Sequence, residues 1–391
     1  MKYKIITATI ISGLLIRIFL SLYIPAFYAP DEKPHYKYIV YLMKYKKLPI
    51  QTSKTDDPTY DWEYYQPPLY YLLLSFFLTS LSHINLNSDV SFYLIRMFSI
   101  LLWLIGALIY VKLFAYLNFK YEEKLFFFSI YSFLPSFVYL TSVINNDNLL
   151  NFFFPIILLV LSTKIKGKEL LLGFILALSL MTKLTAIIYI FFTFFYLLFY
   201  EKSFKKALLK FFVICSIILF LSLPWFIRNL HIYNSFTGFD IVNKKIYLNP
   251  FTAFNNIWST FFAAAGYHNE IRFLHIFNIF LGYYLFFTIT LGFYLSLKNK
   301  FLKFPFISFI TFYLQFILVL KVACEYRQPQ GRFLFCILFL IIYNLLFTFK
   351  NLKINIKRLS HLTLFLSIIY LIGYLIKVFT YIKTHPFYMR G

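Results

Sequence analysis

The sequence predicts an all-α, polytopic membrane protein. Of its 391 residues, 61% are hydrophobic, and 53 are Phe and 34 are Tyr. A water-soluble domain of this length cannot bury so much apolar surface. The apolar residues are also gathered into long runs, and the charged residues lie mostly in the short segments between them. These two patterns are typical of helices that cross a bilayer.

The chain is strongly basic, with a formal net charge of +23. In a soluble protein this excess would indicate binding to nucleic acid, but here the lysines lie mostly in short loops, as the positive-inside rule describes. We therefore expect a lipid bilayer as a partner and no nucleic acid. The three cysteines form no CxxC pair and are too scattered for a disulfide framework, a zinc ribbon or a haem attachment site.

The apolar runs predict about eleven transmembrane helices, several of them shorter than the roughly 20 residues that a bilayer needs. The predicted spans are 5–24, 94–117, 125–144, 148–163, 169–182, 184–200, 211–228, 273–297, 304–322, 333–349 and 360–381. The first span contains Arg17 and has no A-x-A cleavage site after it, so we interpret it as a retained helix and not as a signal peptide. We expect residues 1–391 to form a single membrane domain.

Residues 69–83 begin after Pro67-Pro68 and are either another span or a helix on the membrane surface. If they lie on the surface, the basic loops share one face of the membrane; if they span, every later loop moves to the opposite face. The positive-inside rule favours the surface helix and a cytoplasmic N-terminus in the cell membrane, plasma or inner. Two long loops, at about 25–93 and 229–272, then lie on the extracytoplasmic face.

The first long loop carries Pro30-Asp31-Glu32-Lys33-Pro34-His35 just after the first apolar run. A carboxylate on such a turn can accept a proton from a substrate hydroxyl or help to hold a metal. The alternative is a helix N-terminus, where acidic residues serve as caps and are favoured by the helix dipole.

Other polar residues stand at turns on the same predicted face. Asp147 lies in a short turn between two apolar runs, where a carboxylate is costly without a partner or a function; the alternative is again an N-cap. Lys183, Arg228 and Arg332, the last within Gln330-Gly331-Arg332-Phe333, suit a lipid phosphate, and the alternative is a cation that snorkels at a helix end.

The second long loop contains His268, Glu270 and His275, which could bind a metal, although their spacing matches no strong ligand motif. The sequence has no G-x-G-x-x-G, P-loop or G-x-S-x-G motif. Nucleotide binding by those routes and serine hydrolysis are therefore not supported.

The motifs in order along residues 1 to 350 are Asp31-Glu32, Gln66-Pro67-Pro68-Leu69-Tyr70-Tyr71, Arg96, Asp147, Thr182-Lys183, Arg228-Asn229 and Gln330-Gly331-Arg332-Phe333. Together they resemble those of the GT-C membrane glycosyltransferases, and most closely the branch with protein O-mannosyltransferases and the aminoarabinose transferase of lipid A. The resemblance implies a GT-C-type fold with juxtamembrane helices in the first long loop. It also implies transfer of a sugar, with inversion, from a polyprenyl phosphate to an acceptor hydroxyl on the extracytoplasmic face. The acceptor would be carried by a lipid, a glycan or a protein.

The resemblance assigns Asp31 as the general base and Glu32 as a supporting or metal-contacting acid. It implies that Asp147 is the acid of the second outer loop and that Lys183, Arg228 and Arg332 contact the donor phosphate. We expect His35 and Gln330 to bind substrate as well, although His35 departs from the pattern of the family. A divalent cation is left open as a cofactor, because members of the superfamily differ in metal use. The alternatives are a transporter or flippase of lipid-linked saccharides, which would place polar groups at the bilayer midplane, and an inactive scaffold with the same fold.

Overall fold

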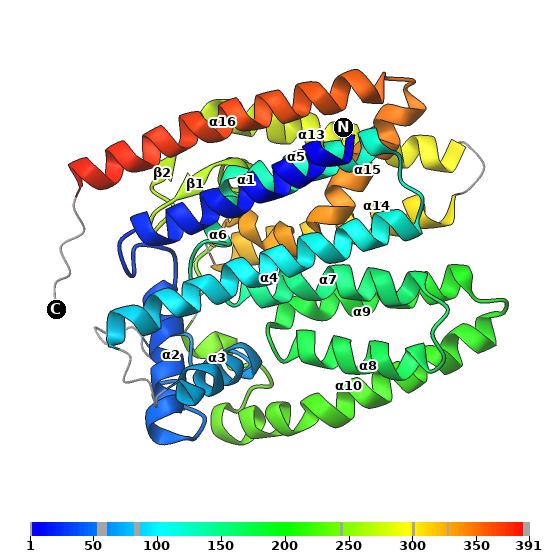
Figure 1. Ribbon diagram of the computed structural model, residues 1–391. Helices are drawn as coiled ribbons and strands as arrows, with labels where there is room; N and C mark the ends of the chain where they lie inside the picture. Colours follow the sequence, from blue (N-terminus) through cyan, green and yellow to red (C-terminus); the bar gives the residue numbers. More distant parts are fainter. Residues whose placement is uncertain are drawn as a thin grey trace. The chain divides into compact units, whose positions relative to one another are not determined.

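The computed structural model describes residues 2–52, 61–81, 87–242, 245–298, 302–326 and 328–385. It is built almost wholly of α-helices (Figure 1). In these described ranges the only strands are β1 (Ala264–Ala265) and β2 (Ile271–Arg272), which pair antiparallel. The predicted all-α class is confirmed.

Seven helical segments of the described chain are long and apolar enough to cross a bilayer. They are α1 (Lys2–Tyr23), α4 (Ser88–Tyr116), α10 (Phe204–Tyr233), α13 (His275–Lys298), α14 (Lys303–Tyr326), the 3₁₀-helix η3 (Gly331–Ile337) with α15 (Leu338–Asn351), and α16 (Ile356–Thr384). Each falls on a predicted span. The prediction of a polytopic membrane fold is therefore also confirmed.

The other four predicted spans also coincide with helices, all of them shorter. They are α5 (Tyr121–Phe133) with α6 (Pro135–Leu140), α7 (Asp147–Ser162), α8 (Lys168–Leu180), and the 3₁₀-helix η2 (Leu184–Ala186) with α9 (Ile187–Tyr200). The predicted span 125–144 is not continuous, because Leu134 is extended (φ −62°, ψ 113°) between α5 and α6. Pro135 causes this break, since proline has no N–H to donate and disfavours the helical conformation in the residue before it.

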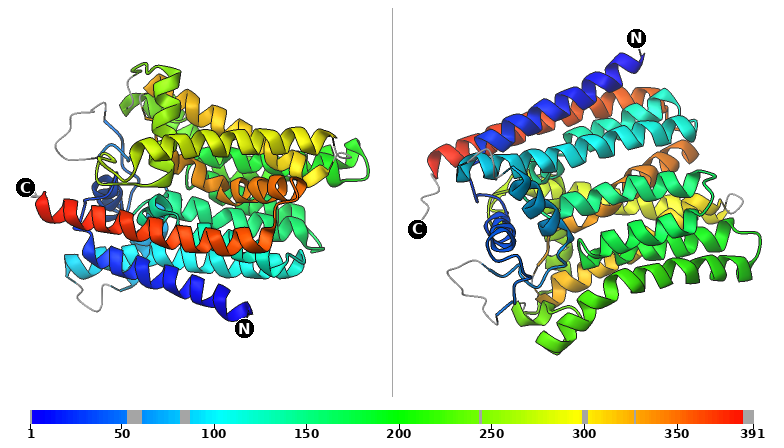
Figure 2. Two further views of the ribbon diagram at one scale, coloured as in Figure 1. Left: turned by 90° about the horizontal axis from the view of Figure 1, so that it is seen from above. Right: turned by 60° about the horizontal axis from the view of Figure 1, so that its bottom comes forward.

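The long loops contain α2 (Glu32–Tyr45), α3 (Leu69–Ser80), α11 (Phe239–Val242) and α12 (Pro250–Phe262). With 12 residues, α3 is about 18 Å long, which is well short of the roughly 30 Å of a hydrocarbon core. Helix α2 runs at a steep angle to α10, which belongs to the same stretch of packed helices, as Figures 1 and 2 show. The short length of α3 favours the prediction that residues 69–83 form a surface helix; residues 82 and 83 lie outside the described part of the chain.

The chain divides into two compact units, each assembled from separate segments. Unit 1 comprises Met1–Pro30, Tyr110–Ser142 and Ile246–Gly391, and unit 2 comprises Asp31–Ile109 and Val143–Lys245. The segments of the two units alternate along the sequence, so neither unit is one continuous stretch. The single domain 1–391 stays a prediction.

In unit 1, α5 packs against both α1 and α16, and Figure 2 shows α1 and α16 side by side. The fully buried Arg17 of α1 donates hydrogen bonds to the hydroxyl of Thr141 (2.7 Å) and to the carbonyls of Ser132 (3.0 Å) and Tyr131 (3.4 Å). The Tyr131 carbonyl faces Pro135, which has no N–H to offer. Arg17 therefore caps the broken end of α5.

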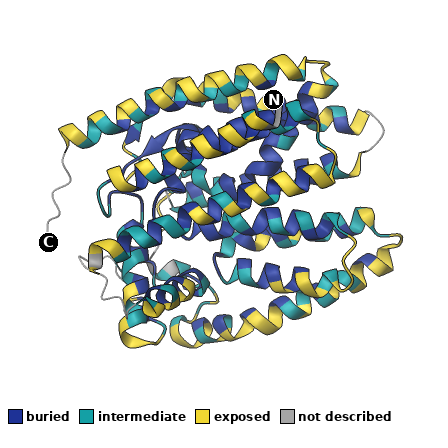
Figure 3. Ribbon diagram, in the orientation of Figure 1, coloured by how far each residue is buried: buried dark blue, intermediate teal, exposed yellow. Residues whose placement is uncertain are grey.

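In unit 2, α8 packs against α7 and α10, and α2 packs against α3. The outer face of α10 is apolar and exposed: Phe212 is 69% and Phe220 is 79% exposed. Figure 3 shows exposed residues along α10, and separately along α16 of unit 1. In a polytopic protein, such faces are the ones that contact lipid.

Candidate functional site

Asp31 precedes the first turn of α2 and has a left-handed backbone (φ 60°, ψ 6°). This conformation is uncommon outside glycine and costs roughly 1–3 kcal/mol. Its side chain makes no capping hydrogen bond to α2. The carboxylate instead accepts a hydrogen bond from the indole N–H of Trp62, at 3.4 Å. The side chain of Asp31 therefore does not cap α2, although the residue stands at the N-cap position.

Glu32 is fully buried and forms a bidentate ion pair with Arg96 of α4. Its Oε1 accepts from Arg96 Nε and its Oε2 from Arg96 Nη2, both at 2.8 Å. The backbone N–H of Ile144 also donates to Oε1, at 3.0 Å. Glu32 thus joins α2, α4 and the turn before α7 within unit 2. With both oxygens engaged in this way, the geometry favours its supporting role over proton transfer.

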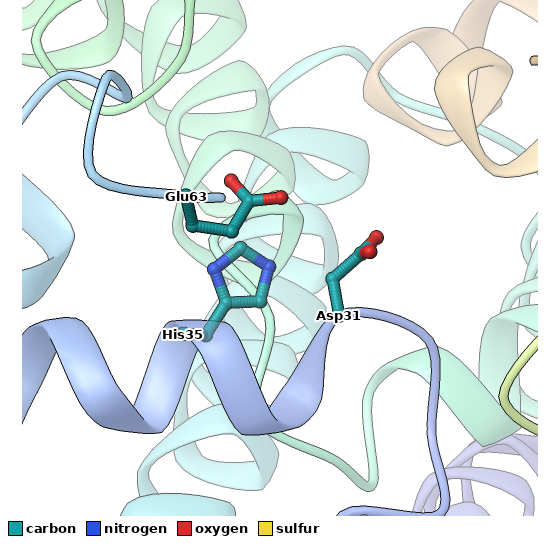
Figure 4. A group of neighbouring side chains, drawn as sticks. All are labelled: Asp31, His35 and Glu63. Carbon is teal, nitrogen blue, oxygen red and sulfur yellow. The ribbon is translucent and has the colours of Figure 1, made fainter. Parts of the chain in front are cut away.

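His35 follows Asp31 by four residues, which places the two side chains on the same side of α2. Ligand atoms of Asp31, His35 and Glu63 all lie within 4.8 Å of one another, and Figure 4 shows the three side chains converging above the helix. His35 and Glu63 are buried, whereas Asp31 is half-buried. We call these three residues the Asp31 cluster.

Tyr71 of α3 orients the imidazole in this cluster, because its hydroxyl lies 2.8 Å from His35 Nδ1. Burial raises the pKa of Tyr71 well above its usual value, and the nearby charge of Glu63 raises it further. The phenol therefore stays protonated at neutral pH. The amide of Asn146 reaches the same hydroxyl from the turn before α7, at 3.5 Å.

Asp147 begins α7 and is ion-paired with Lys183, which precedes η2. The distance from Lys183 Nζ to Asp147 Oδ1 is 2.5 Å, and both side chains are buried. At this end of α7 the N-cap, Asn146, makes no side-chain capping bond, and Asn145 Oδ1 accepts from the backbone N–H of Asp147 at 2.9 Å. The side chains of Asp147 and Lys183 together provide one neutralised pair beside the Asn146–Tyr71 contact.

Arg228, in the second half of α10, is half-buried. Its Nη2 donates to the carbonyl of Pro49 at 2.5 Å, and its guanidinium lies 5.0 Å from the centre of the Trp225 ring. The residue therefore ties the segment after α2 to α10 within unit 2.

Gln330 and Arg332 belong to unit 1, at the start of η3, and both are half-buried. The Arg332 guanidinium lies 5.5 Å from the centre of the Phe333 ring. Gly331 between them packs against α12: a Cβ there would lie 2.4 Å from the Ile257 carbonyl oxygen and from the Phe261 nitrogen. The glycine of this motif is thus required by close backbone packing.

His268, Glu270 and His275 do not converge on a common point. Over the described part of the chain, the Asp31 cluster is the group of three or more His, Cys, Asp or Glu side chains whose ligand atoms come together. One oxygen of Glu270 accepts instead from the backbone N–H of His268, at 2.8 Å. The second long loop therefore does not supply the metal site that its composition suggested.

Three residues of the site were not assigned a role from the sequence: Glu63, Tyr71 and Arg96. Tyr71 belongs to the Gln66–Tyr71 motif and Arg96 is a motif residue itself, so the sequence pattern pointed to both positions without giving them a role. Glu63 stands three residues before Gln66-Pro67-Pro68, and no spacing relates it to Asp31 or His35. Only the path of the first long loop brings it there.

No protein-family model matches the sequence, and no curated protein matches it either. Among solved structures, ArnT from Cupriavidus metallidurans, in a crystal structure bound to undecaprenyl phosphate, is similar, with a TM-score of 0.59 and 14% sequence identity. The match covers 87% of this chain and 59% of the ArnT chain, so this chain spans less than two thirds of that protein. The chain therefore has an ArnT-like polytopic membrane fold, in agreement with the GT-C-type fold that its motifs predict.

Proposed function

We propose that this protein is an integral membrane glycosyltransferase of the GT-C type. It transfers a sugar from a polyprenyl phosphate to an acceptor hydroxyl on the extracytoplasmic face, with inversion. The observation that carries the proposal is the half-buried, non-capping carboxylate of Asp31, which is held in a strained backbone. The fold shared with ArnT, whose structure holds undecaprenyl phosphate, supports the class of donor.

In the proposed reaction, Asp31 is the general base. The acceptor oxygen forms a bond to the anomeric carbon, the bond from that carbon to the phosphate oxygen breaks, and the acceptor proton moves to Asp31. The polyprenyl phosphate leaves with the electron pair of the broken bond. One base and positive charge near the leaving phosphate are what a single inverting displacement needs.

The remaining predicted residues take binding roles in this proposal. Glu32 positions α2 through Arg96, and His35 and Asp147 bind substrate hydroxyls. Lys183 and Arg228 of unit 2 are proposed contacts of the donor phosphate. For Arg332 and Gln330 of unit 1, contact with the donor phosphate and with the substrate, respectively, stays a prediction from the sequence. Lys183 is paired with Asp147, so its charge becomes available to a phosphate only in so far as that pair opens.

The alternative function, transport or flipping of a lipid-linked saccharide, would use polar groups near the bilayer midplane. Arg17 is the charged residue within the first predicted span, and it donates hydrogen bonds to the Thr141 hydroxyl after α6 and to carbonyls at the end of α5. A structural role accounts for this residue, which favours the enzyme.

The test is transfer by purified protein in liposomes that contain radiolabelled polyprenyl-phosphate sugars and mixed membrane acceptors. We expect label on an acceptor with the native protein and none with Asp31→Asn, because this change removes the base and little volume. Asp89→Asn is the matched control, since Asp89 is an exposed aspartate in the first turn of α4. Full transfer by Asp31→Asn would refute the role of Asp31, and label that crosses the membrane without transfer would favour the flippase.

A further inference from the structure

We infer that the Asp31 cluster is a binding site for a divalent transition-metal cation of the Zn²⁺ or Mn²⁺ kind, with Asp31, His35 and Glu63 as its protein ligands. The inference goes beyond the proposed function, because it concerns a binding event that can be measured without any transfer reaction. It rests on the geometry, the ligand types and the hydrogen bonds that orient them.

The three ligand atoms are close enough to share one ion. They lie within 4.8 Å of one another, and bonds of about 2.0–2.2 Å place the ligands of one ion about 3.3–4.4 Å apart. Small side-chain rotations bridge this difference. Asp31 and His35 are one helical turn apart at the start of α2, and Glu63 approaches from the segment before α3 (Figure 4). Two separate segments of unit 2 would thus be joined through the ion.

The ligand types select the class of ion. One imidazole with two carboxylates suits Zn²⁺ or Mn²⁺, whereas Mg²⁺ and Ca²⁺ prefer shells made of oxygen alone. Three protein ligands leave at least one coordination position for water or substrate, which is the pattern of open sites and not of closed structural ones. The cluster also holds the carboxylate of Glu63 in a buried setting, where charges are normally paired or bound to metal.

The surroundings orient the ligands as in known metal sites. His35 Nδ1 lies 2.8 Å from the Tyr71 hydroxyl, which leaves Nε2 as the nitrogen for the ion. A hydrogen bond to the second ring nitrogen is usual for metal-bound histidine, and it fixes the ring. The indole of Trp62 donates to Asp31 Oδ1, so one carboxylate is held by a second contact as well.

If the proposed transfer reaction holds, the ion has a clear use there, and His35 would then bind the substrate through the ion. An oxygen of the substrate, from a hydroxyl or from a phosphate, would occupy the open position and be polarised by the ion. Each residue needs to offer only one ligand atom, so Asp31 retains a second oxygen for the acceptor proton. This part of the inference rests on the proposed function, whereas the binding of the ion does not.

The experiment measures metal binding by the full-length protein in detergent after treatment with a chelator and removal of that chelator. Zn²⁺, Mn²⁺ and Co²⁺ are added singly; binding is followed by titration calorimetry and elemental analysis, and Co²⁺ also by its visible absorption. We expect one equivalent of each ion, with Zn²⁺ bound more tightly than Mn²⁺. His35→Ala and Glu63→Gln should each weaken Zn²⁺ binding by at least about 100-fold, and Tyr71→Phe by about 10-fold or more.

The controls are His361→Ala and Glu325→Gln, which change an exposed histidine of α16 and a glutamate of α14 outside the cluster. His35→Cys distinguishes loss of a ligand from loss of folding, because a thiolate also binds Zn²⁺. This variant should retain Zn²⁺ binding, and its Co²⁺ absorption spectrum should shift. Native protein that binds no stoichiometric ion would overturn the inference. Equal binding by native protein, His35→Ala and Glu63→Gln would overturn it too.

The two proposals fail in different ways. Transfer that requires Asp31 in a protein that binds no ion would refute the metal site and leave the transferase. Stoichiometric binding that depends on His35 and Glu63, in a protein that transfers no sugar, would refute the transferase and leave the metal site.

Discussion

The buried pair of Glu32 and Arg96 gives the sharpest prediction about stability. Both side chains are fully buried, and two hydrogen bonds of 2.8 Å join them. Changing Arg96 to Met removes the cation and leaves the buried carboxylate of Glu32 without its bidentate partner, while the N–H of Ile144 still donates to it. Removing one member of such a pair costs about 3–5 kcal/mol, which is a large part of a total stability of about 5–15 kcal/mol.

The assay is thermal unfolding of detergent-solubilised protein, followed by the fraction that remains monodisperse after heating. At roughly 2 °C per kcal/mol for a large chain, Arg96→Met should lower the unfolding temperature by roughly 6–10 °C. Glu32→Gln together with Arg96→Met should recover part of this loss, because the double change leaves no uncompensated charge.

The exposed pair of Lys321 and Glu325 is the matched control for this prediction. Its atoms are 3.9 Å apart, and the Lys321 side chain is 66% exposed. Glu325→Gln should change stability by no more than about 0.5 kcal/mol. A loss below about 1 kcal/mol in Arg96→Met, or a double variant that is less stable than both single variants, would refute the reasoning.

Three further predictions concern the rest of the chain. Arg17→Lys should lower the unfolding temperature, because a single ammonium group cannot span the Thr141 hydroxyl after α6 and the carbonyls at the end of α5 that the guanidinium joins; an unchanged unfolding temperature would contradict the capping role. Gly331→Ala should destabilise the protein by about 1–3 kcal/mol, because its Cβ would overlap the backbone of α12. An unaltered unfolding temperature would show that α12 shifts to accommodate the methyl group, and would contradict this prediction. Burial raises the pKa of Tyr71 above its usual 10.0, so the unfolded chain releases this proton first and stability should fall as the pH rises above about 10. Tyr71→Phe should show a shallower fall over that range, and an equal fall would contradict the prediction.

Much of the fold follows from local features of the sequence. The runs of apolar residues locate the membrane helices, because a span is a property of about 20 consecutive residues and needs no distant partner. The break at Pro135 is local too, since it follows from the missing N–H of proline, although hydropathy alone joined 125–144 into one span. The polar turns at Asp31 and Asp147 were likewise visible as charges beside apolar runs.

The sequence by itself therefore determined the class of fold, the positions of the helices and the polar turns that merit attention. Only the tertiary structure decided what each carboxylate does. Neighbouring side chains at a helix start point about 100° apart, so Asp31 and Glu32 meet different surroundings: Glu32 meets Arg96, 64 residues away, while Asp31 faces His35 and Glu63. No periodicity encodes the path of the loop that carries Glu63, because that path is set by packing between segments distant in the chain.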